Sequence, residues 1–283
     1  MKKQMSVRGV TAAIRSIPDT VHLYLRSMAM LIKSQVQYPV SFLMQTVAQL
    51  VMEGGELMAL ILVIDRFDRI DHWGPGDLFF FFGMMSVTFY ITECFGRGIT
   101  GNFPYLVRSG QLDTILLRPR GVLTQVLCSA VDPRRITCIA VGVTALTIGC
   151  RMAAVSWTPL KVLALAESIL FGSILILGLF MIEAIFCIHS VKSVELVNAL
   201  TYGGRSACQY PMDIYPRPLR ALFTMIAPFA LTLHAPAAYI LGKPLYGWPG
   251  WVAFVSPLSG PAVFIIIYIL FQRAMKFYRS TGS

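Results

Sequence analysis

The segment from Arg108 to Arg120, with the sequence RSGQLDTILLRPR, separates long apolar runs from one another. Its charged residues cannot sit in a hydrocarbon layer, because charges facing lipid are costly. The runs on either side are apolar enough, and long enough, to cross a hydrocarbon core of ~30 Å. This alternation predicts a membrane protein in which the segment is the best candidate for contact with a soluble partner.

The composition of the whole chain supports this class. Of 283 residues, 56% are hydrophobic and 13% are charged, whereas soluble domains carry about 25% charged residues. The net charge of +10 would suggest nucleic-acid binding in a soluble chain, but in a membrane protein the placement of Lys and Arg matters more. We therefore expect no nucleic-acid partner. The six cysteines form no Cys-x-x-Cys pair, so we expect packing residues and no metal site.

The apolar runs predict an all-α integral membrane protein with six transmembrane helices, an N-terminal interfacial helix, a cytoplasmic loop and a re-entrant element before the last helix. Residues 1–37 form the amphipathic N-terminal segment, although they could instead extend the first span. A single six-helix transmembrane domain follows at 38–272, with its cytoplasmic loop at 102–135, and a basic tail at 273–283.

Five apolar spans are expected at about 38–64, 78–100, 136–154, 162–188 and 254–271. Residues 65–76 between the first two predict a short loop with Trp73 at the membrane interface. Between residues 222 and 249 several prolines interrupt the apolar pattern, which predicts a helix that stops partway and a re-entrant pair. Residues 189–220 are polar enough to be expected on the inner side.

The distribution of basic residues predicts the orientation. With both termini inside, the inner segments hold 19 of the 24 Lys and Arg residues: six before Tyr38, six from Arg97 to Arg135, four from Lys192 to Arg220 and three in the tail. This asymmetry fits the positive-inside rule. We therefore expect a multi-pass membrane protein with both termini, and the 102–135 loop, in the cytoplasm.

The first span carries a polar stripe. At 100° per residue, five polar residues fall within a ~120° arc of the helix surface: Ser41, Gln45, Gln49, Glu53 and Glu56. Because ionisable groups avoid lipid, the stripe should face protein or a wet cavity, either as a translocation path or subunit interface or as interhelical hydrogen bonding. In the second span, Glu93 and Arg97 are four residues apart, so they can pair on one helical face.

No motif for an energy source or for catalysis is present. The phosphate-binding pattern Gly-x-x-x-x-Gly-Lys-Ser/Thr is absent, and the Gly-Lys pair at Gly242 runs straight into Pro244. There is no Gly-x-Ser-x-Gly or His-Glu-x-x-His motif. Any transport work therefore requires energy from another chain, and we expect no catalytic residue and no cofactor bound by this chain.

The 108–119 segment resembles the cytoplasmic loop of a bacterial branch of the type-two ABC exporter permeases. The shared pattern is Arg-x-Gly-x-Leu-Asp-x-x-Leu-x-Arg-Pro, formed here by Arg108, Gly110, Leu112, Asp113, Leu116, Arg118 and Pro119. Weaker similarities are a Phe-x-x-Gly at 80–83, the Tyr-Pro pairs at 210–216 and the Ala-Pro-Phe-Ala at 227–230 before Pro236. The resemblance extends over about residues 38–242.

The resemblance implies a permease subunit of an ATP-driven transporter in the bacterial cytoplasmic (inner) membrane, which exports an amphipathic or hydrophobic cargo such as a lipid, drug or peptide. It also implies that the 102–135 loop is the coupling loop. It implies a second permease copy or a sister permease, membrane lipids as neighbours, and cytoplasmic ABC ATPase subunits that bind the ATP and magnesium. The seven pattern residues would dock onto the ATPase. A path or subunit-interface role for Gln45, Gln49, Glu53, Glu56, Glu93 and Arg97 is our inference from the polar stripe.

Two other classes remain open. A membrane-embedded lipid-modifying enzyme could use Glu53, Glu56 and Glu93 as acid–base groups, although no nucleophile, metal cluster or phosphate motif accompanies them. A membrane scaffold without transport activity is the other. Copurification of a nucleotide-binding subunit would favour the transporter, and activity without ATP would favour the enzyme.

Overall fold

The computed structural model describes residue 22 and residues 24–35, 37–67, 72–189, 194–244 and 249–278. In these ranges every regular element is a helix, as predicted. The first long helices are α2 (Pro39–Phe67), α3 (Pro75–Arg97), α7 (Arg135–Met152) and α8 (Pro159–His189). The short helices between α3 and α7 are η1 (Gly98–Asn102), α4 (Phe103–Arg108), α5 (Gln111–Leu116) and α6 (Val122–Leu127).

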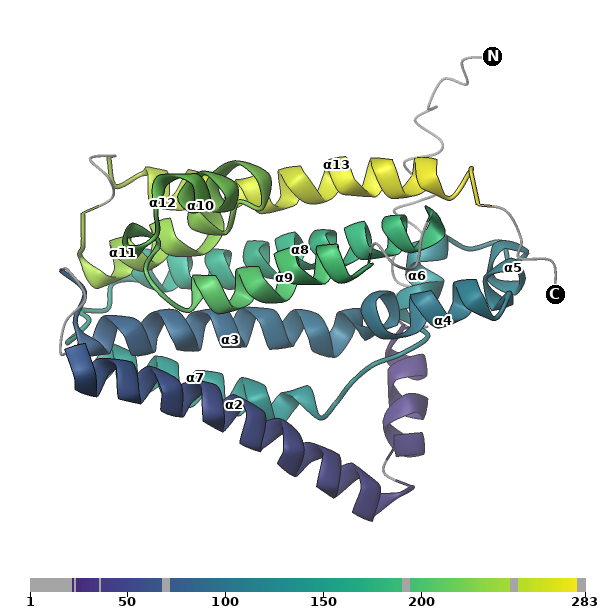
Figure 1. Cartoon of the computed structure of the whole chain (residues 1–283), viewed down its shortest axis with the longest axis horizontal. Helices are drawn as coiled ribbons and strands as arrows, with labels where there is room; N and C mark the ends of the chain where they lie inside the picture. Colours follow the sequence, from purple (N-terminus) through teal and green to yellow (C-terminus); the bar gives the residue numbers. More distant parts are fainter. Residues whose placement is uncertain are drawn as a thin grey trace.

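The second half of the chain contains α9 (Val194–Cys208), the single turn η3 (Met212–Ile214) and the last long helix, α13 (Ser259–Ala274). Between η3 and α13 lie α10 (Arg217–Ala221), η4 (Leu222–Ile226), η5 (Ala230–His234), α11 (Ala235–Leu241), α12 (Val252–Val255) and η6 (Ser256–Leu258). The long helices form one elongated bundle, with α4, α5 and α6 at one end and α10, α11 and α12 at the other (Figure 1).

Five helical segments in the described ranges are long and apolar enough to span a membrane: residues 39–66, 75–108, 135–152, 159–188 and 252–274. This confirms the five apolar spans and the all-α membrane class. Two further segments, 217–226 and 230–241, meet at 85°. The bend follows from Pro228, because the residue before a proline is pushed out of the helical region. Ala227 accordingly has φ −118° and ψ 85°, and the bent pair fits the re-entrant element predicted before the last helix.

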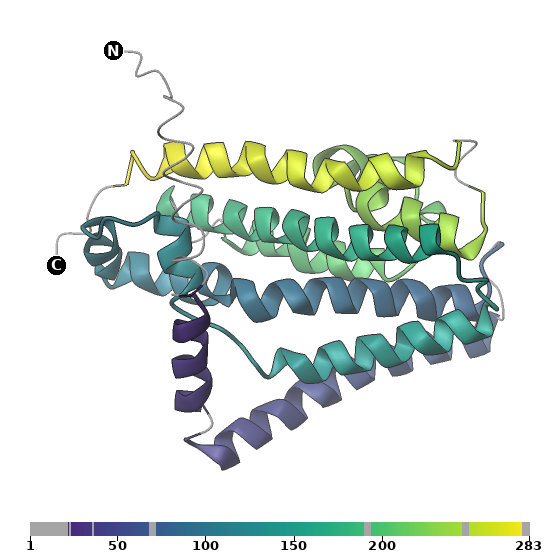
Figure 2. The ribbon, with the colours of Figure 1, turned by 180° about the vertical axis from the view of Figure 1, so that it is seen from behind.

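The prediction for residues 189–220 is wrong. The described part of this stretch contains α9, which lies lengthwise beside α3 and α8 rather than on the inner surface (Figures 1 and 2). It then leads to α10 at the end opposite α5. The polar residues of α9 were mistaken for solvated ones, whereas they face other polar groups inside the bundle. Arg205, Arg217 and Arg220 are therefore not among the basic residues at the α5 end of the bundle.

Helix α3 is the centre of the bundle. In the most apolar part of the segment 75–108, 18 residues long, 89% of the residues are buried, compared with 11% in the corresponding part of α2. A helix that is apolar all round is expected to be buried, and α3 carries Phe80, Phe81, Phe82 and Phe89 at the core. Its closest neighbour is α7: a Cβ added to Gly149 would lie 2.4 Å from the backbone nitrogen of Phe80. Small residues therefore let the two backbones touch.

The N-terminal helical residues 24–35 run crosswise to the long helices, at the α5 end of the bundle (Figure 2). Tyr24 and Gln35 tie this segment to the rest of the chain, because the Tyr24 hydroxyl donates to the Phe95 carbonyl at 3.0 Å and the Gln35 amide donates to the Val131 carbonyl at 2.9 Å. The crosswise course agrees with an interfacial helix. The remainder of the predicted 1–37 segment lies outside the described residues.

One detail of the 65–76 loop is corrected. Helix α2 continues to Phe67, and Trp73 is completely buried instead of lying at an interface. Its indole Nε1 donates to Asp213 Oδ2 at 3.2 Å. A tryptophan whose N–H finds a partner can be buried, and the partner lies 140 positions away in the sequence, so no local pattern could reveal it.

Candidate functional site

The predicted coupling loop is a helical hairpin built around Gly110. This glycine has φ +69° and ψ 0° and stands between α4 and α5, a left-handed conformation that costs other L-residues about 1–2 kcal/mol. The Ser109 N–H donates to the Tyr105 carbonyl at 2.9 Å and closes α4. The chain therefore turns at Gly110, and α5 lies across the very end of the bundle (Figure 1).

Helix α5 is amphipathic, but its exposed face differs from the one predicted. Leu112 and Ile115 are buried in the main core, whereas Leu116 is 40% exposed. The three- and four-residue spacing of Leu112, Ile115 and Leu116 predicts a short amphipathic helix with Leu112 and Leu116 buried. For Leu116 this prediction is wrong, because the tight turn at Gly110 rotates it outward. The next residue, Leu117, is 86% exposed. It was not singled out because it lies off the three- and four-residue spacing of Leu112, Ile115 and Leu116.

The charged residues of the loop surround this apolar tip. Arg108, Arg118 and Pro119 are exposed. Asp113 is half-buried and lies close to Tyr278 in the tail. The pKa of Tyr278 is raised, first by burial and then by the negative charge of Asp113. The loop therefore presents two leucines next to arginines, and its acidic residue faces the chain's own C-terminal segment.

The polar stripe of α2 forms a buried network with α3 and α9. Glu53, which is 1% exposed, accepts hydrogen bonds from Ser86 Oγ at 2.8 Å and from the Tyr90 hydroxyl. Arg205 Nη2 of α9 lies 2.8 Å from Glu53 Oε2. The prediction that the stripe faces protein is confirmed for this residue.

Arg205 also holds the second carboxylate of the stripe. Its Nη1 donates to Glu56 Oε1 at 2.8 Å, and Gln209 Nε2 donates to Glu56 Oε2 at 2.9 Å. The guanidinium carbon stands 4.8 Å from the centroid of the Tyr90 ring, a distance at which a cation and an aromatic face attract. One arginine of α9 therefore clamps two glutamates of α2.

A second cluster lies between this network and the α5 end. The predicted pair of Glu93 and Arg97 is confirmed at 3.3 Å, but Arg135 Nη2 is closer to Glu93 Oε1, at 2.8 Å. The Tyr202 hydroxyl donates to the same oxygen at 3.2 Å. Arg135 Nη1 donates to Gln49 Oε1 at 2.5 Å, which joins the first residue of α7 to α2.

Gln45 does not join either cluster. It is exposed, and its amide donates to Ser41 one turn earlier at 3.0 Å. Five of the six predicted path or interface residues are thus brought together by direct hydrogen bonds and ion pairs, and Gln45 is not. Neither partner arginine, Arg135 or Arg205, was identified from the sequence. For Arg205 a signal existed, because Thr201, Arg205 and Gln209 repeat every four residues like the stripe they meet.

The geometry explains how these charges are tolerated inside a bundle. Counting Asp132 and Arg134, which pair at 2.6 Å, four carboxylates face four guanidiniums across the two clusters. A buried pair is sustained by its hydrogen bonds, and removal of one partner typically costs about 3–5 kcal/mol. The carboxylates Glu53, Glu56 and Glu93 are all engaged by arginine, so they join α2, α3, α7 and α9 and are not presented as acid–base groups.

Comparison with known proteins gives one match. A family model described as "ABC-2 family transporter protein" matches residues 50–282, which include α5 and every residue of the two polar clusters except Gln49. No curated protein and no solved structure matches the chain.

Proposed function

The chain belongs to the ABC-2 transporter family, and we propose from this premise that it is a permease subunit whose α5 loop docks onto a separate cytoplasmic ATPase. Membership makes it a multi-pass transport subunit that works with an ABC ATPase subunit rather than an enzyme. The observation that carries the docking proposal is the exposed apolar tip of Leu116 and Leu117, next to Arg118. It stands at the end of the most deeply buried helix of the bundle.

The contacts of α5 make it a rigid lever. Helices α3, η1 and α4 form one continuous segment from Pro75 to Arg108. A Cβ added to Gly98, directly after α3, would lie 1.9 Å from the Val126 carbonyl oxygen, so this segment touches the backbone of α6. Gln125 of α6 donates to the carbonyls of Ile115 and Arg120, at 3.1 and 2.9 Å. A push on the tip of α5 is therefore passed to α3.

The polar clusters supply the next step of the proposed mechanism. Arg135 begins α7 and contacts Glu93 of α3 and Gln49 of α2, while Arg205 ties α2 to α9. Movement of α3 therefore changes the angle at which α2 and α9 are held. In this proposal ATP and magnesium bind to the ATPase subunit, and this chain converts closure of the ATPase into rotation of its helices.

The surface of α2 supports a second permease copy or a sister permease as partner. Its exposed residues include Val40, Met44, Val51 and Met52, beside the clamped glutamates. In this proposal a path for an amphipathic or hydrophobic cargo runs along α2 and α9, and the glutamates hold its wall together instead of binding cargo directly. Export of such a cargo is the direction we propose.

The basic residues support a cytoplasmic α5 end. Among the described residues, ten Lys and Arg belong to elements at this end: Arg26, Lys33, Arg97, Arg108, Arg118, Arg120, Arg134, Arg135, Arg273 and Lys276. Six belong to the other end: Arg66, Arg151, Lys161, Arg217, Arg220 and Lys243. The bias is smaller than the sequence count suggested, yet of the same sign, so we place both termini in the cytoplasm of a bacterial inner membrane.

Copurification tests the docking proposal. The chain is isolated from native membranes in mild detergent, and associated proteins with a nucleotide-binding motif are identified by mass spectrometry. We expect an ATPase subunit with the natural chain and its loss with Leu117→Asp, because a charge at the centre of an apolar contact is desolvated without a partner. Trp157→Asp is the matched control, since Trp157 is 45% exposed in the loop between α7 and α8, at the opposite end. Equal recovery of the ATPase with both variants would rule out docking through α5.

A further inference from the structure

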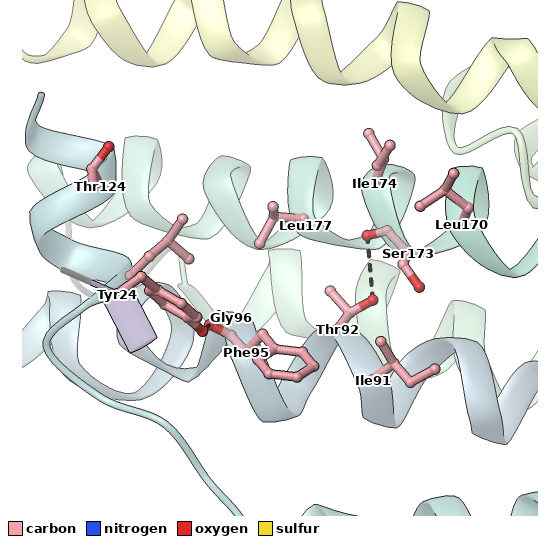
Figure 3. Close-up of a pocket in the computed structure, with 11 residues that line it drawn as sticks. Tyr24, Ile91, Thr92, Phe95, Gly96, Thr124, Leu170, Ser173, Ile174 and Leu177 are labelled. Atoms are coloured by element: carbon pink, nitrogen blue, oxygen red, sulfur yellow. Dashed lines mark hydrogen bonds between the residues drawn. The ribbon is translucent and has the colours of Figure 1, made fainter. Parts of the chain in front are cut away.

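Two neighbouring cavities lie at the α5 end of the bundle, outside the polar clusters. The first has a volume of about 380 Å³ and lies between α3, α8 and the N-terminal helix. Figure 3 shows Ile91 and Phe95 of α3 on one side, with Leu170, Ile174 and Leu177 of α8 on the other. The cavity therefore extends along two membrane-spanning helices and ends at Tyr24 and Thr124, near the bundle's end.

The polar atoms of α3 and α8 that line this first cavity are already paired. Thr92 Oγ1 donates to the Thr88 carbonyl at 2.9 Å and lies 3.3 Å from the Ser173 carbonyl. Ser173 Oγ donates to the Thr88 carbonyl at 3.3 Å. A polar ligand would thus lose its own hydrogen bonds with water and gain little there. The lining suits a hydrocarbon chain.

The second cavity, of about 600 Å³, has the opposite character. It lies between α4, α5, α6 and the N-terminal helix, and Arg118 and Arg120 both line it. Its other polar lining residues are Ser27, Asn102, Gln111, Thr114, Gln125 and Ser129. The oxygen Oε1 of Gln125 is buried without a hydrogen-bond partner among the described residues, although the Nε2 of the same amide makes two hydrogen bonds. The cavity thus offers two cations and one unsatisfied acceptor.

The two cavities lie next to each other, one on either side of the contact between the N-terminal helix and α6. Tyr24 lines the first and Ser27 the second, one turn further along the N-terminal helix. On α6, Thr124 lines the first and the next residue, Gln125, the second. Ser27 and Cys128 both line the second cavity, so the N-terminal helix and α6 contribute to the same wall. An apolar space inside the bundle is therefore followed directly by a basic, polar space at its end.

We propose that these cavities together bind one anionic phospholipid of the inner leaflet as a resident lipid. Its phosphate lies between Arg118 and Arg120, a hydroxyl of a glycerol headgroup donates to Gln125 Oε1, and one acyl chain lies between α3 and α8. Arginine suits phosphate because of its charge and its several donors, and basic clusters at the inner surface attract anionic lipids. The lipid would brace the N-terminal helix against the α5 loop.

The apolar neighbour is what selects a lipid over a soluble phosphate compound. A nucleotide or free phosphate would satisfy the two arginines but leave the first cavity unfilled. The site is also separate from the cargo path proposed along α2 and α9, because α2 and α9 contribute no residue to the lining of either cavity. A resident lipid would stay bound during transport.

Native mass spectrometry of the detergent-purified chain tests the proposal, with phosphatidylglycerol and phosphatidylcholine of identical acyl chains as probes. We expect one phosphatidylglycerol to be retained in preference to phosphatidylcholine. Arg120→Gln should weaken retention of phosphatidylglycerol about fivefold, the effect of one basic residue near an anionic headgroup. Arg273→Gln is the matched control, because Arg273 is an exposed arginine at the same end that lines neither cavity.

Filling the apolar cavity gives a second, independent test. Leu170→Trp should weaken retention of both lipids. If this variant folds poorly, Ile174→Trp, at a less exposed position, should have the same effect. Leu163→Trp is the control, on the same helix but outside the cavity. The proposal would be overturned if the two lipids bound equally, or if binding were unchanged in Arg120→Gln or in both tryptophan variants. It would also be overturned if glycerophosphoglycerol, which has no acyl chains, displaced the lipid. Release of the lipid when the complex with its ATPase receives ATP would instead identify cargo, and would equally overturn it.

Discussion

Replacing Arg205 by methionine removes the only side chain that ties α2 to α9 through charge among the described residues. Glu53 would keep Ser86 and Tyr90 as donors but would lose its ion pair while 1% exposed. Loss of one partner of a buried pair costs about 3–5 kcal/mol. At about 2–4 °C per kcal/mol for a protein of 150–250 residues, the expected fall in Tm is on the order of 10 °C.

The assay is thermal unfolding of the purified chain in detergent, with Arg217→Met as control. Arg217 is exposed in α10, so its loss should leave Tm within about 2 °C of the natural chain. The double variant Glu53→Gln with Arg205→Met should recover part of the loss, because glutamine at position 53 needs no counter-charge. If Arg205→Met alone unfolds at the same temperature as Arg217→Met, the clamp does not hold α2 to α9.

Three further predictions concern other parts of the chain. Gly149→Ala should lower the free energy of unfolding by about 1–3 kcal/mol, because the added Cβ would lie 2.4 Å from the Phe80 nitrogen. Gly203→Ala is the control and should cause no such loss, because its added Cβ meets nothing within 4 Å. Equal denaturation midpoints for the two variants would contradict the close approach of α3 and α7. Gly110→Ala should cost about 1 kcal/mol through its φ of +69° and should reduce cargo-stimulated ATP hydrolysis in the reconstituted complex; unchanged stimulation would mean that the shape of the α4–α5 turn is irrelevant to coupling. Burial raises the pKa of the Cys128 thiol, so at neutral pH less thiolate is present in the folded protein than in the unfolded chain. Alkylation of Cys128, measured by peptide mass spectrometry, should therefore be slower in the folded protein and its rate should rise more steeply above pH 8–9. Identical alkylation rates in the folded and unfolded chain would show that the Cys128 thiol is not buried.

Much of the fold follows from hydrophobic length alone. The five apolar spans, the proline-interrupted pair and the short helices of the 102–135 loop each have a local signal: a run of apolar residues, a proline or a glycine. The Glu93–Arg97 pair is local as well, because four residues separate its members on one helix. These features needed no knowledge of distant contacts.

The features that the sequence could not reveal depend on distant partners. Helix α9 contains Arg205 and Gln209, which lie inside the bundle because Glu53 and Glu56, about 150 positions earlier, pair with them. Hydropathy rates the helix as polar, since it scores residues one at a time. Arg135 was likewise assigned to a solvated loop, although it reaches Gln49 and Glu93.

The exposed tip of α5 shows the same limit on a smaller scale. The spacing of Leu112, Ile115 and Leu116 predicts one apolar face, but the left-handed turn at Gly110 decides which of those residues meets the core. Leu117, beyond the end of the helix, becomes the most exposed apolar residue of the loop. A pattern of residues gives the period of a helix, whereas its rotation against the bundle depends on the packing.

The most direct test of the central claim, that α5 meets the ATPase, is site-specific photocrosslinking in native membranes. A photoreactive phenylalanine analogue is placed at Leu117 and, as control, at Met225, and the adducts are identified by mass spectrometry. We predict an adduct with a nucleotide-binding subunit from position 117 and none from position 225. The absence of that adduct at 117, in cells where the ATPase subunit copurifies with the chain, would contradict the account.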